Sequence, residues 1–240
     1  MIDKANSYHE RLSGMGAQEI LSSVVGMHPG KVVFSTSLGA EDQVITHMIS
    51  SLRLDVSIFT LDTGRMFPET YDVLAKTGAR YGINIQVFFP DADNVEKMVN
   101  SRGINLFYES IENRKLCCNI RKIEPLKRAL KGYEVWITGL RREQSPTRNN
   151  MKFAEWDQGN GIIKLNPLLE WTEQDVWTFI GDNKVPYNTL HDRGFPSIGC
   201  QPCTRAVMPG EDIRSGRWWW EHPETKECGL HLLGRNKVVK

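Results

Sequence analysis

The residues of this chain best suited to chemistry are its five cysteines, which form two close pairs and one isolated position. Cys117 and Cys118 are adjacent, Cys200 and Cys203 are two residues apart, and Cys228 stands alone. Adjacent cysteines pair with each other only under strain, whereas a Cys-x-x-Cys step can place two thiolates on one metal centre. The two pairs therefore predict a four-thiolate centre for zinc or an iron–sulfur cluster, and spacing alone does not choose between these. The alternative, ordinary buried apolar cysteines, fits two close pairs poorly.

The fifth cysteine has no remaining partner. Cys228 lies in a polar stretch with Lys226 and Glu227 before it and His231 after it. The thiolate is the reactive form of cysteine, and nearby cations stabilise it, although Glu227 opposes them. We interpret Cys228 as a nucleophile with His231 as a catalytic neighbour, against the alternative of an incidental cysteine near the end of the chain.

Three polar segments have the composition of anion-binding loops. Residues 35–42 combine hydroxyl groups, a glycine and the start of an expected helix, which suits a phosphate or sulfate group. They lack the Gly-Lys-Ser/Thr ending of a nucleoside triphosphate P-loop. Residues 62–65 form the second segment, and residues 139–148 form the third, with Arg141, Arg142 and Arg148 available for bidentate capture of an anion. Each segment taken alone is also compatible with an ordinary turn.

The elements that must position these segments alternate between apolar runs and amphipathic stretches. The pattern predicts strands at residues 31–35, 55–61, 83–89 and 134–138, and helices over residues 41–51, 68–81, 93–101 and 120–130. This rhythm implies an α/β fold, with a doubly wound, mostly parallel sheet covered by helices on both faces. Because ligands of such folds bind beyond the carboxyl ends of the strands, the three polar segments are expected to converge.

The second half of the chain is less regular. Residues 151–156 and 161–165 are expected to pair as a hairpin, and Thr172 with Asp175 predicts a capped helix start. Glycine, proline and charge dominate after residue 182, which predicts loops and a mobile C-terminal tail. We therefore divide the chain into an α/β unit, residues 1–204, and a mobile segment, residues 205–240. Three consecutive tryptophans, 218–220, are interpreted as an anchor for this segment, with a docking surface as the alternative.

Composition narrows the class of protein. The chain has 240 residues, with 30 basic and 29 acidic side chains, and such a balance argues against a general nucleic-acid or membrane-surface binder. The first 18 residues have no signal-peptide core, and no apolar run is long enough to span a membrane. We therefore expect a cytoplasmic protein, in which cysteines stay reduced and serve metal binding or catalysis.

Together these motifs resemble the iron–sulfur branch of the assimilatory sulfonucleotide reductases, the adenylyl-sulfate (APS) reductases. The resemblance covers nearly the whole chain. Its most specific part is the cysteine pattern combined with Glu-Cys-Gly-Leu-His at 227–231. The other motifs are Ser-Thr-Ser-Leu-Gly-Ala-Glu-Asp at 35–42, Leu-Asp-Thr-Gly-Arg at 61–65, Cys-Cys-x-x-x-Lys at 117–122 and Gly-Leu-Arg-Arg-Glu-Gln-Ser at 139–145.

The resemblance implies an adenine-nucleotide α-hydrolase-like fold and specific residue roles. The phosphosulfate group would meet the loop containing Ser35, Ser37 and Gly39. The nucleotide would contact Gly139 and Arg148, and the anion would be covered by Arg214 and Arg217. A [4Fe–4S] cluster would be held by Cys117, Cys118, Cys200 and Cys203. Lys122 would lie between this cluster and the substrate.

The resemblance also implies a reaction. Cys228 would attack the sulfur of APS, release AMP and become an S-sulfocysteine, from which reduced thioredoxin or a similar dithiol protein would release sulfite. Nine residues follow His231 in this sequence, so we expect the reductant to be a separate protein.

Other functions remain open at this stage. A reductase of the 3′-phosphorylated nucleotide, PAPS, or of both nucleotides differs only in substrate. A zinc-stapled nucleotide-binding protein without turnover would use the same four cysteines structurally. An ATP pyrophosphatase-type ligase is a weaker alternative, because it expects a serine-glycine-glycine phosphate loop. Assembly into a homo-oligomer is also left open.

Overall fold

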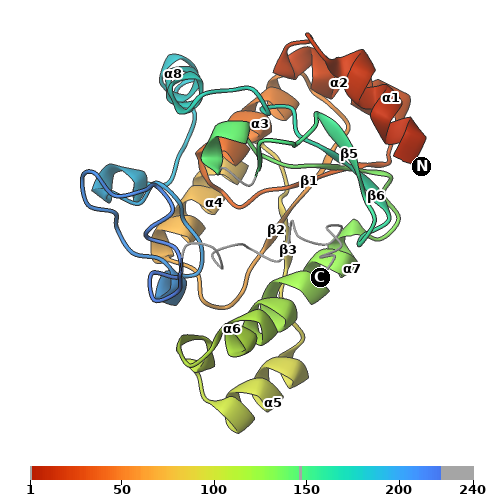
Figure 1. Ribbon diagram of the computed structural model, residues 1–240. Coiled ribbons are helices and arrows are strands. Elements are labelled where there is room, and N and C mark those ends of the chain that lie inside the picture. The colour runs from red at the N-terminus through yellow and green to blue at the C-terminus, as the bar shows by residue number, and fades with distance from the viewer. Residues whose placement is uncertain (1, 146–147, 223–240) are drawn as a thin grey trace.

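The computed structural model describes residues 2–145 and 148–222, which are built around a single six-stranded sheet (Figure 1). The spatial order of the strands is β3-β2-β1-β4-β6-β5, and every neighbouring pair is parallel except β5 with β6. The strands are β1 (Val32–Ser35), β2 (Ser57–Leu61), β3 (Gln86–Phe88), β4 (Val135–Ile137), β5 (Ala154–Asp157) and β6 (Ile162–Leu165). The predicted α/β fold with a mostly parallel sheet is confirmed.

Helices connect the strands and cover the sheet. They are α1 (Ile2–Leu12), α2 (Ala17–Met27), α3 (Ala40–Ser51), α4 (Pro68–Tyr81), α5 (Ala92–Arg102), α6 (Ile111–Cys118), α7 (Glu124–Leu130) and α8 (Glu173–Asn183). The predicted strands and helices before residue 138 are all present, with ends that differ by a few residues. Helices α1 and α2 were not predicted. No helix in the described ranges has both the length and the apolar character needed to cross a membrane.

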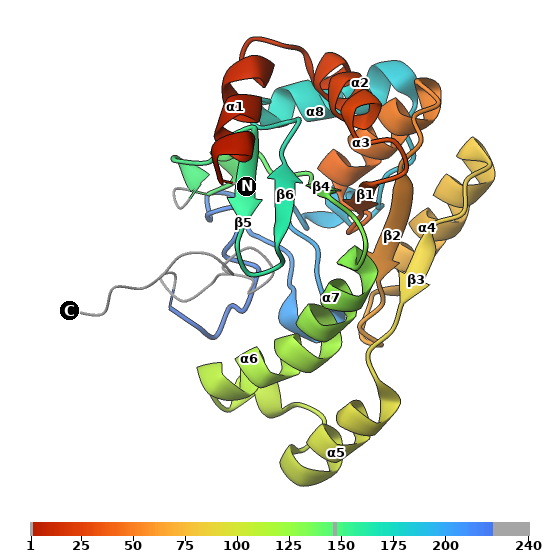
Figure 2. The same ribbon diagram turned by 90° about the vertical axis from the view of Figure 1, so that its right-hand side faces the viewer.

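Alternating side chains of the central strands bury both faces of the sheet. On β1, Val32 and Phe34 pack with α1 to α4 and α8, whereas Val33 packs with Trp136 of β4 and with Leu126 of α7. Figure 2 shows α1, α2, α3 and α8 on one side of the sheet and α7 on the other. A strand buried on both faces reads as a continuous apolar run, which is why Lys31-Val-Val-Phe-Ser marked β1 in the sequence.

The helix that carries the first cysteine pair begins earlier than predicted. Instead of one helix over residues 120–130, α6 starts at Ile111 and passes through a π-helical turn, residues 119–123, into α7. Proline at position 125 is tolerated because it falls in the first turn of α7. Ser110 caps α6, since its hydroxyl accepts a hydrogen bond from the Asn113 N–H at 3.1 Å. The cysteine pair therefore lies at the end of α6, and Lys122 lies within the widened helical turn that follows it.

The second half of the chain follows the predicted order of elements. β5 and β6 form the expected antiparallel hairpin, and Thr172 and Asp175 form the expected capping box at the start of α8. Residues after α8 contain loops and short 3₁₀ turns, as predicted.

The first part of the segment predicted to be mobile, from residue 205 onward, packs against the rest of the structure, and its mobility stays a prediction. Arg205 donates its backbone N–H to Gly216 at 2.9 Å, and Thr204 forms a β-bridge with Arg217. Trp218 is only 1% exposed, as the anchor interpretation predicts. The boundary between residues 204 and 205 therefore falls inside a packed loop, and the described chain stays attached to the body through Glu221. The rest of the predicted segment, including Cys228 and His231, lies outside the described residues.

We predict that Ser110→Ala lowers the free energy of unfolding by about 1 kcal/mol, because the first turn of α6 loses its side-chain cap. The quantity is measured by urea unfolding at equilibrium. Ser101→Ala is the matched control, since the Ser101 hydroxyl donates to the carbonyls of Lys97 and Met98 within α5 and caps no helix end. Equal effects of the two substitutions would contradict the assigned cap.

Candidate active site

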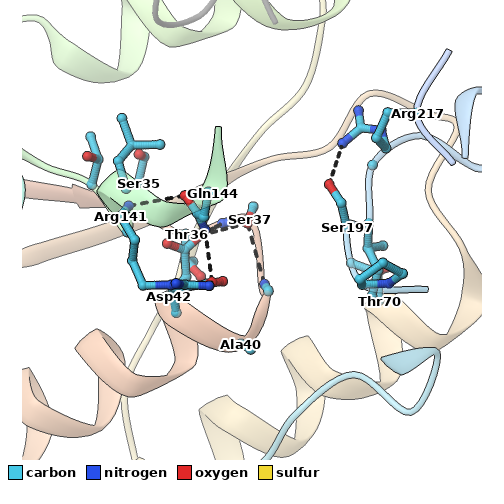
Figure 3. Close-up of a pocket in the computed structure, with 18 of the residues that line it drawn as sticks. Ser35, Thr36, Ser37, Ala40, Asp42, Thr70, Arg141, Gln144, Ser197 and Arg217 are labelled. Carbon is cyan, nitrogen blue, oxygen red and sulfur yellow. Dashed lines mark hydrogen bonds and ion pairs between the residues drawn. The ribbon is translucent and has the colours of Figure 1, made fainter. Parts of the chain in front are cut away.

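The candidate site lies where the strand order reverses. β1 and β4 are neighbours at the centre of the sheet, and the chain winds outward in opposite directions from them, which opens a crevice at their carboxyl ends. A cavity of about 280 Å³ occupies this position. Its walls come from the loops after β1, β2 and β4, and from residues 196–200 and 213–217. Figure 3 shows Ser197 and Arg217 facing the loop of Ser37 across this space.

The cavity brings together all seven substrate-binding residues predicted from the sequence. Its lining includes Ser35, Ser37, Gly39, Gly139, Arg148, Arg214 and Arg217, together with Lys122 and Cys200. The predicted convergence of the polar loops is therefore confirmed, while the role of each residue remains a prediction. Cys228 and His231 cannot be located, because they lie outside the described residues.

A buried carboxylate missed by the sequence analysis shapes the first loop. Asp42, in the first turn of α3, accepts hydrogen bonds from the N–H of Ser37 at 2.5 Å and from its hydroxyl at 2.6 Å. Leu38 has a φ of 63°, a left-handed conformation that is costly for a branched side chain and that the surrounding contacts must hold. The loop after β1 is thus locked in one shape before any ligand arrives.

The Asp42 carboxylate also contacts the loop after β4. A Cβ atom at position 139 would collide with the Asp42 carboxylate, so the backbone of Gly139 lies directly against it. Glycine is therefore required here by close approach rather than by an unusual backbone angle. Burial raises the pKa of Asp42 to about 6, partly offset by the hydrogen bonds from Ser37. Its position in the 35–42 motif was visible in the sequence, but its partner at residue 139 was not.

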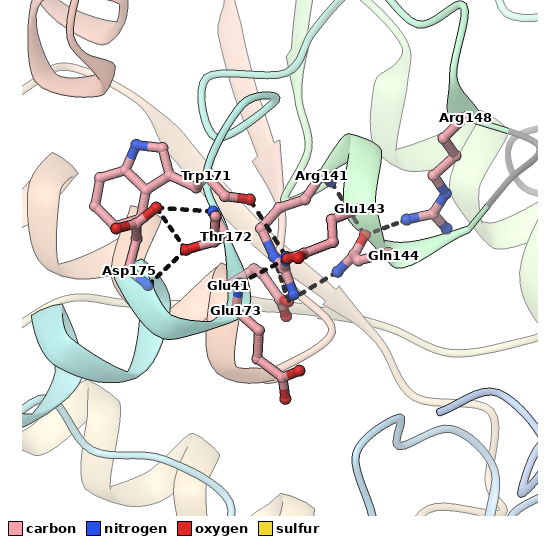
Figure 4. A network of polar contacts seen from close by, with 9 residues as sticks. All are labelled: Glu41, Arg141, Glu143, Gln144, Arg148, Trp171, Thr172, Glu173 and Asp175. Atoms are coloured by element: carbon pink, nitrogen blue, oxygen red, sulfur yellow. Dashed lines mark hydrogen bonds and ion pairs between the residues drawn. The ribbon is translucent and has the colours of Figure 1, made fainter. Parts of the chain in front are cut away.

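The sequence predicted anion binding for all three arginines after β4, but their surroundings in the structure differ. Arg141 is buried and pairs with Glu41 at 2.9 Å and Glu143 at 3.0 Å (Figure 4). Arg142 pairs with Glu170 at 2.6 Å and does not line the cavity. Arg148 lines the cavity and donates to the side chain of Gln144. The prediction of anion binding by all three arginines is therefore wrong for Arg142, and it stays a prediction for Arg141 and Arg148.

Arg148 is placed through a chain of polar contacts. It donates to the side-chain oxygen of Gln144, whose amide nitrogen donates to Glu41 at 2.8 Å. Glu41 is fixed in turn by Arg141 (Figure 4). Glu41 belongs to α3, whereas the other residues follow β4. This network therefore fixes the orientation of Arg148 relative to both segments that line the cavity.

The opposite wall presents a second guanidinium. Arg217 is buried, and its Nη1 donates to the Ser197 hydroxyl at 3.4 Å. Its Nε has no hydrogen-bond partner within the described part of the chain. A side chain at Gly199 would collide with this guanidinium, so the glycine makes the room that Arg217 occupies. A buried donor without a partner is costly, so the contacts around Arg217 must hold this guanidinium in place.

The four predicted metal-ligand cysteines converge beside the cavity. The thiol of Cys203 lies close enough to Cys200 and Cys118 for their charges to raise its pKa, and Cys200 does the same to Cys117. Cys200 also lines the cavity. Within the described ranges, no three Cys, His, Asp or Glu side chains surround a single metal-ion position.

Cations and a hydroxyl group surround these sulfurs. Burial raises the pKa of Cys203 to about 12. Burial also disfavours the thiolate of Cys200, but Lys122 and the Thr63 hydroxyl, 3.3 Å from its sulfur, outweigh that effect and leave its pKa below the ordinary value. Arg121 adds to the positive field and donates to the Thr63 carbonyl at 2.6 Å. The loop after β2, which alone resembled an ordinary turn, therefore supports the cysteine centre.

The doubly wound α/β fold carries a polar cavity lined by arginines, Lys122 and Cys200, and similarity to known proteins identifies the family to which this arrangement belongs. Residues 31–206 match the phosphoadenosine phosphosulfate reductase domain. The chain is 53% identical over 215 residues to the adenosine 5′-phosphosulfate reductase of Allochromatium vinosum, covering 90% of this chain and 84% of that protein. It is 51% identical over 223 residues to the protein of the same name from Burkholderia cepacia, covering 93% and 87%.

A solved structure gives the same result. The phosphoadenylyl-sulfate (PAPS) reductase of Candida auris, in a phosphate complex, superimposes with a TM-score of 0.73 at 30% identity, covering 86% of this chain and 98% of that one. The chain belongs to the phosphoadenosine phosphosulfate reductase domain family.

The raised pKa of Asp42 predicts a pH-dependent stability. Between about pH 4 and pH 6 the folded protein keeps a proton on Asp42 that the unfolded chain has lost, so ionisation of this group lowers the free energy of unfolding as pH rises. Relative to wild type, Asp42→Asn should gain up to about 3 kcal/mol across this interval. Urea unfolding at several pH values measures the difference, with the exposed Asp72→Asn as control. A difference that stays constant with pH would contradict the assignment.

Proposed function

We propose that this protein is an adenylyl-sulfate reductase of sulfate assimilation, which converts APS to sulfite and AMP. The observation that carries the proposal is the single cavity shared by an anion-binding loop, Lys122 and a cysteine of the four-cysteine centre. The names of relatives that are about half identical over most of the chain support the same substrate.

The cavity offers different surroundings to the two ends of such a substrate. Trp136 and Leu126 form an apolar wall suited to an adenine ring, and the Trp136 indole donates to Ser35 at 2.8 Å. Arg148, held by Gln144, lies toward the loop after β4 and suits the sugar-phosphate portion. The sulfate end would face Lys122 and Arg217, which neutralise its charge and suppress repulsion of an attacking thiolate.

The four cysteines fit a [4Fe–4S] cluster. Such a cluster takes one thiolate on each of four separate iron atoms, so its donors need not surround a single point. Cys117, Cys118, Cys200 and Cys203 would hold it, and Thr63 would donate a hydrogen bond to the Cys200 sulfur. When bound, the cluster would supply a fixed charged and polarising group beside the sulfate. Lys122, whose charge reaches three of these sulfurs, would lie between it and the substrate.

The reaction would proceed by thiol chemistry. The Cys228 thiolate attacks the sulfur of APS, an S–S bond forms, and the S–O bond to AMP breaks with the electron pair leaving on the phosphate oxygen. A thiolate of reduced thioredoxin, or of a similar dithiol protein, then attacks the Cys228 sulfur. Sulfite leaves with the S–S electron pair, and the second thiol of the partner resolves the mixed disulfide. We place this activity in the cytoplasm, where thiols remain reduced.

A second candidate is reduction of PAPS, or of both nucleotides. It is favoured by the name of the 30% identical Candida auris structure. The deciding experiment measures sulfite release by anaerobically purified protein with reduced thioredoxin, comparing APS and PAPS at matched concentration. Strong preference for APS supports the proposal. Equal or faster turnover of PAPS contradicts APS specificity, and no sulfite from either nucleotide contradicts reductase activity.

We predict that Cys228→Ser abolishes sulfite release, because serine cannot act as the sulfur nucleophile, while APS affinity and iron content stay unchanged. Sulfite release and equilibrium APS binding measure the two effects. Cys228→Ser retaining turnover would exclude the proposed nucleophile. Wild-type protein treated identically is the control for loss of activity during anaerobic handling.

We further predict that serine at any one of the four cysteine-centre positions, Cys117, Cys118, Cys200 or Cys203, lowers the bound iron to a small fraction of the wild-type value. Iron, zinc and acid-labile sulfide per chain are the quantities measured. Cys228→Ser is the matched control, since it removes a cysteine outside the proposed ligand set. Full iron in a variant would exclude that ligand, and stoichiometric zinc without iron would favour a zinc-stapled protein.

A further inference from the structure

An aromatic side chain separates two buried guanidinium groups behind the anion pocket. The Arg217 Cζ lies 4.7 Å from the centre of the Trp218 ring, and the Arg114 Cζ lies 4.7 Å from the same ring. Trp218 is 1% exposed, Arg114 2% and Arg217 8%. A guanidinium within about 6 Å of an indole is attracted by the ring quadrupole, and more strongly when both are shielded from water.

The distal guanidinium of this stack, Arg114, is paired with a carboxylate, whereas the one at the cavity, Arg217, donates to the Ser197 hydroxyl. Arg114 donates to both carboxylate oxygens of Glu221, at 2.5 and 3.0 Å, and the Glu221 side chain is 3% exposed. Such a fork has a fixed geometry, which holds Arg114 flat against the indole. The order from the protein interior to the cavity is therefore Glu221, Arg114, Trp218 and Arg217.

The backbone at the centre of the stack is held in an uncommon conformation. Trp218 has a φ of 41°, in the left-handed region that bulky residues rarely adopt. Its N–H donates to the Cys203 carbonyl at 3.2 Å, and its ring packs in the apolar cluster that includes Cys203. Strain of this kind persists only where the surroundings impose it, and it is concentrated at functional sites.

The stack also connects two elements whose relative position matters for the proposed reaction. Arg114 lies on α6, one turn before Cys117, whereas Arg217 lines the cavity from the C-terminal segment. Gly199 leaves just enough space for the Arg217 guanidinium on its other side. The cysteine-bearing helix and the anion-binding arginine are thereby joined through one aromatic ring.

We propose that Trp218, with the Arg114–Glu221 pair behind it, is a positioning unit that holds Arg217 toward the sulfate of the bound nucleotide. The inference rests on the proposed function, because it assigns Arg217 to the sulfate end of APS. The unit acts through Arg217 and touches no substrate atom itself. It therefore sets affinity for the sulfated nucleotide more than affinity for AMP.

The test compares equilibrium binding of APS and of AMP to anaerobically purified, iron-loaded protein. Trp218→Leu keeps an apolar side chain but removes the aromatic face, and it should weaken APS binding about tenfold, the scale of one desolvated cation–π contact, while AMP binding changes less than twofold. Trp218→Phe, which keeps a π face, should restore most of the APS affinity. Trp219→Leu is the matched control, because Trp219 is 39% exposed and its ring contacts are with Tyr108 and Trp220.

A double-mutant cycle separates positioning from general packing. In the Arg217→Ala background, Trp218→Leu should cause no further loss of APS affinity, because the residue through which it acts is gone. Additive losses, equal losses for APS and AMP, or an unchanged APS affinity in Trp218→Leu would each overturn the inference.

The experiment also distinguishes two further outcomes, a variant that loses its iron or its fold and a failure of the proposed function. If Trp218→Leu loses its iron or fails to fold, the paired variant Arg114→Met with Glu221→Met tests the same unit, since replacing both members of a buried ion pair by apolar side chains costs little stability. The same selective loss of APS affinity is expected, and its absence would overturn the inference. If wild-type protein binds no APS, the proposed function is contradicted as well. If wild-type protein reduces APS and the APS affinity of Trp218→Leu is unchanged, only this inference is contradicted.

Discussion

The site depends on one buried carboxylate. Asp42 receives two hydrogen bonds from Ser37, which follows β1, and packs directly against Gly139, which follows β4, so a single side chain joins the two loops at the point where the strand order reverses. Its burial is unfavourable for a charged group, as the raised pKa indicates. The buried carboxylate thus lowers the stability of the fold, but it fixes the conformation of the two loops that line the cavity. The remaining walls of the cavity pack around these loops.

The charged side chains around these two loops are held in two different ways. Arg141 and its carboxylate partners form a structural network in which Glu41 also fixes Gln144, and through it Arg148. On the other wall, Arg217 is supported by the Trp218 ring, and no carboxylate within residues 2–145 and 148–222 forms an ion pair with it. A carboxylate there would cancel the field that a sulfate requires, whereas an indole face orients a guanidinium without neutralising it.

The cysteine centre is linked to the same crevice by short elements. The loop after β2 contributes Thr63, which reaches the Cys200 sulfur and is itself held by Arg121 from the π-helical turn. That turn also changes the phase of the helix between Cys118 and Lys122. Elements far apart in sequence thus place a hydroxyl group and positive charges around the Cys200 sulfur, and together they outweigh burial and lower its pKa.

The sequence by itself determined the alternation of strands and helices, the hairpin, the capping box at Thr172 and the grouping of four cysteines, because each is a local or periodic signal. It could not distinguish Arg142, paired with Glu170 away from the cavity, from Arg148, since spacing along a loop does not fix side-chain direction. Only the tertiary structure decided the contact between Asp42 and Gly139 and the packing around Trp218. These are contacts between segments distant in the chain, and they form only when the sheet brings the carboxyl ends of its strands together.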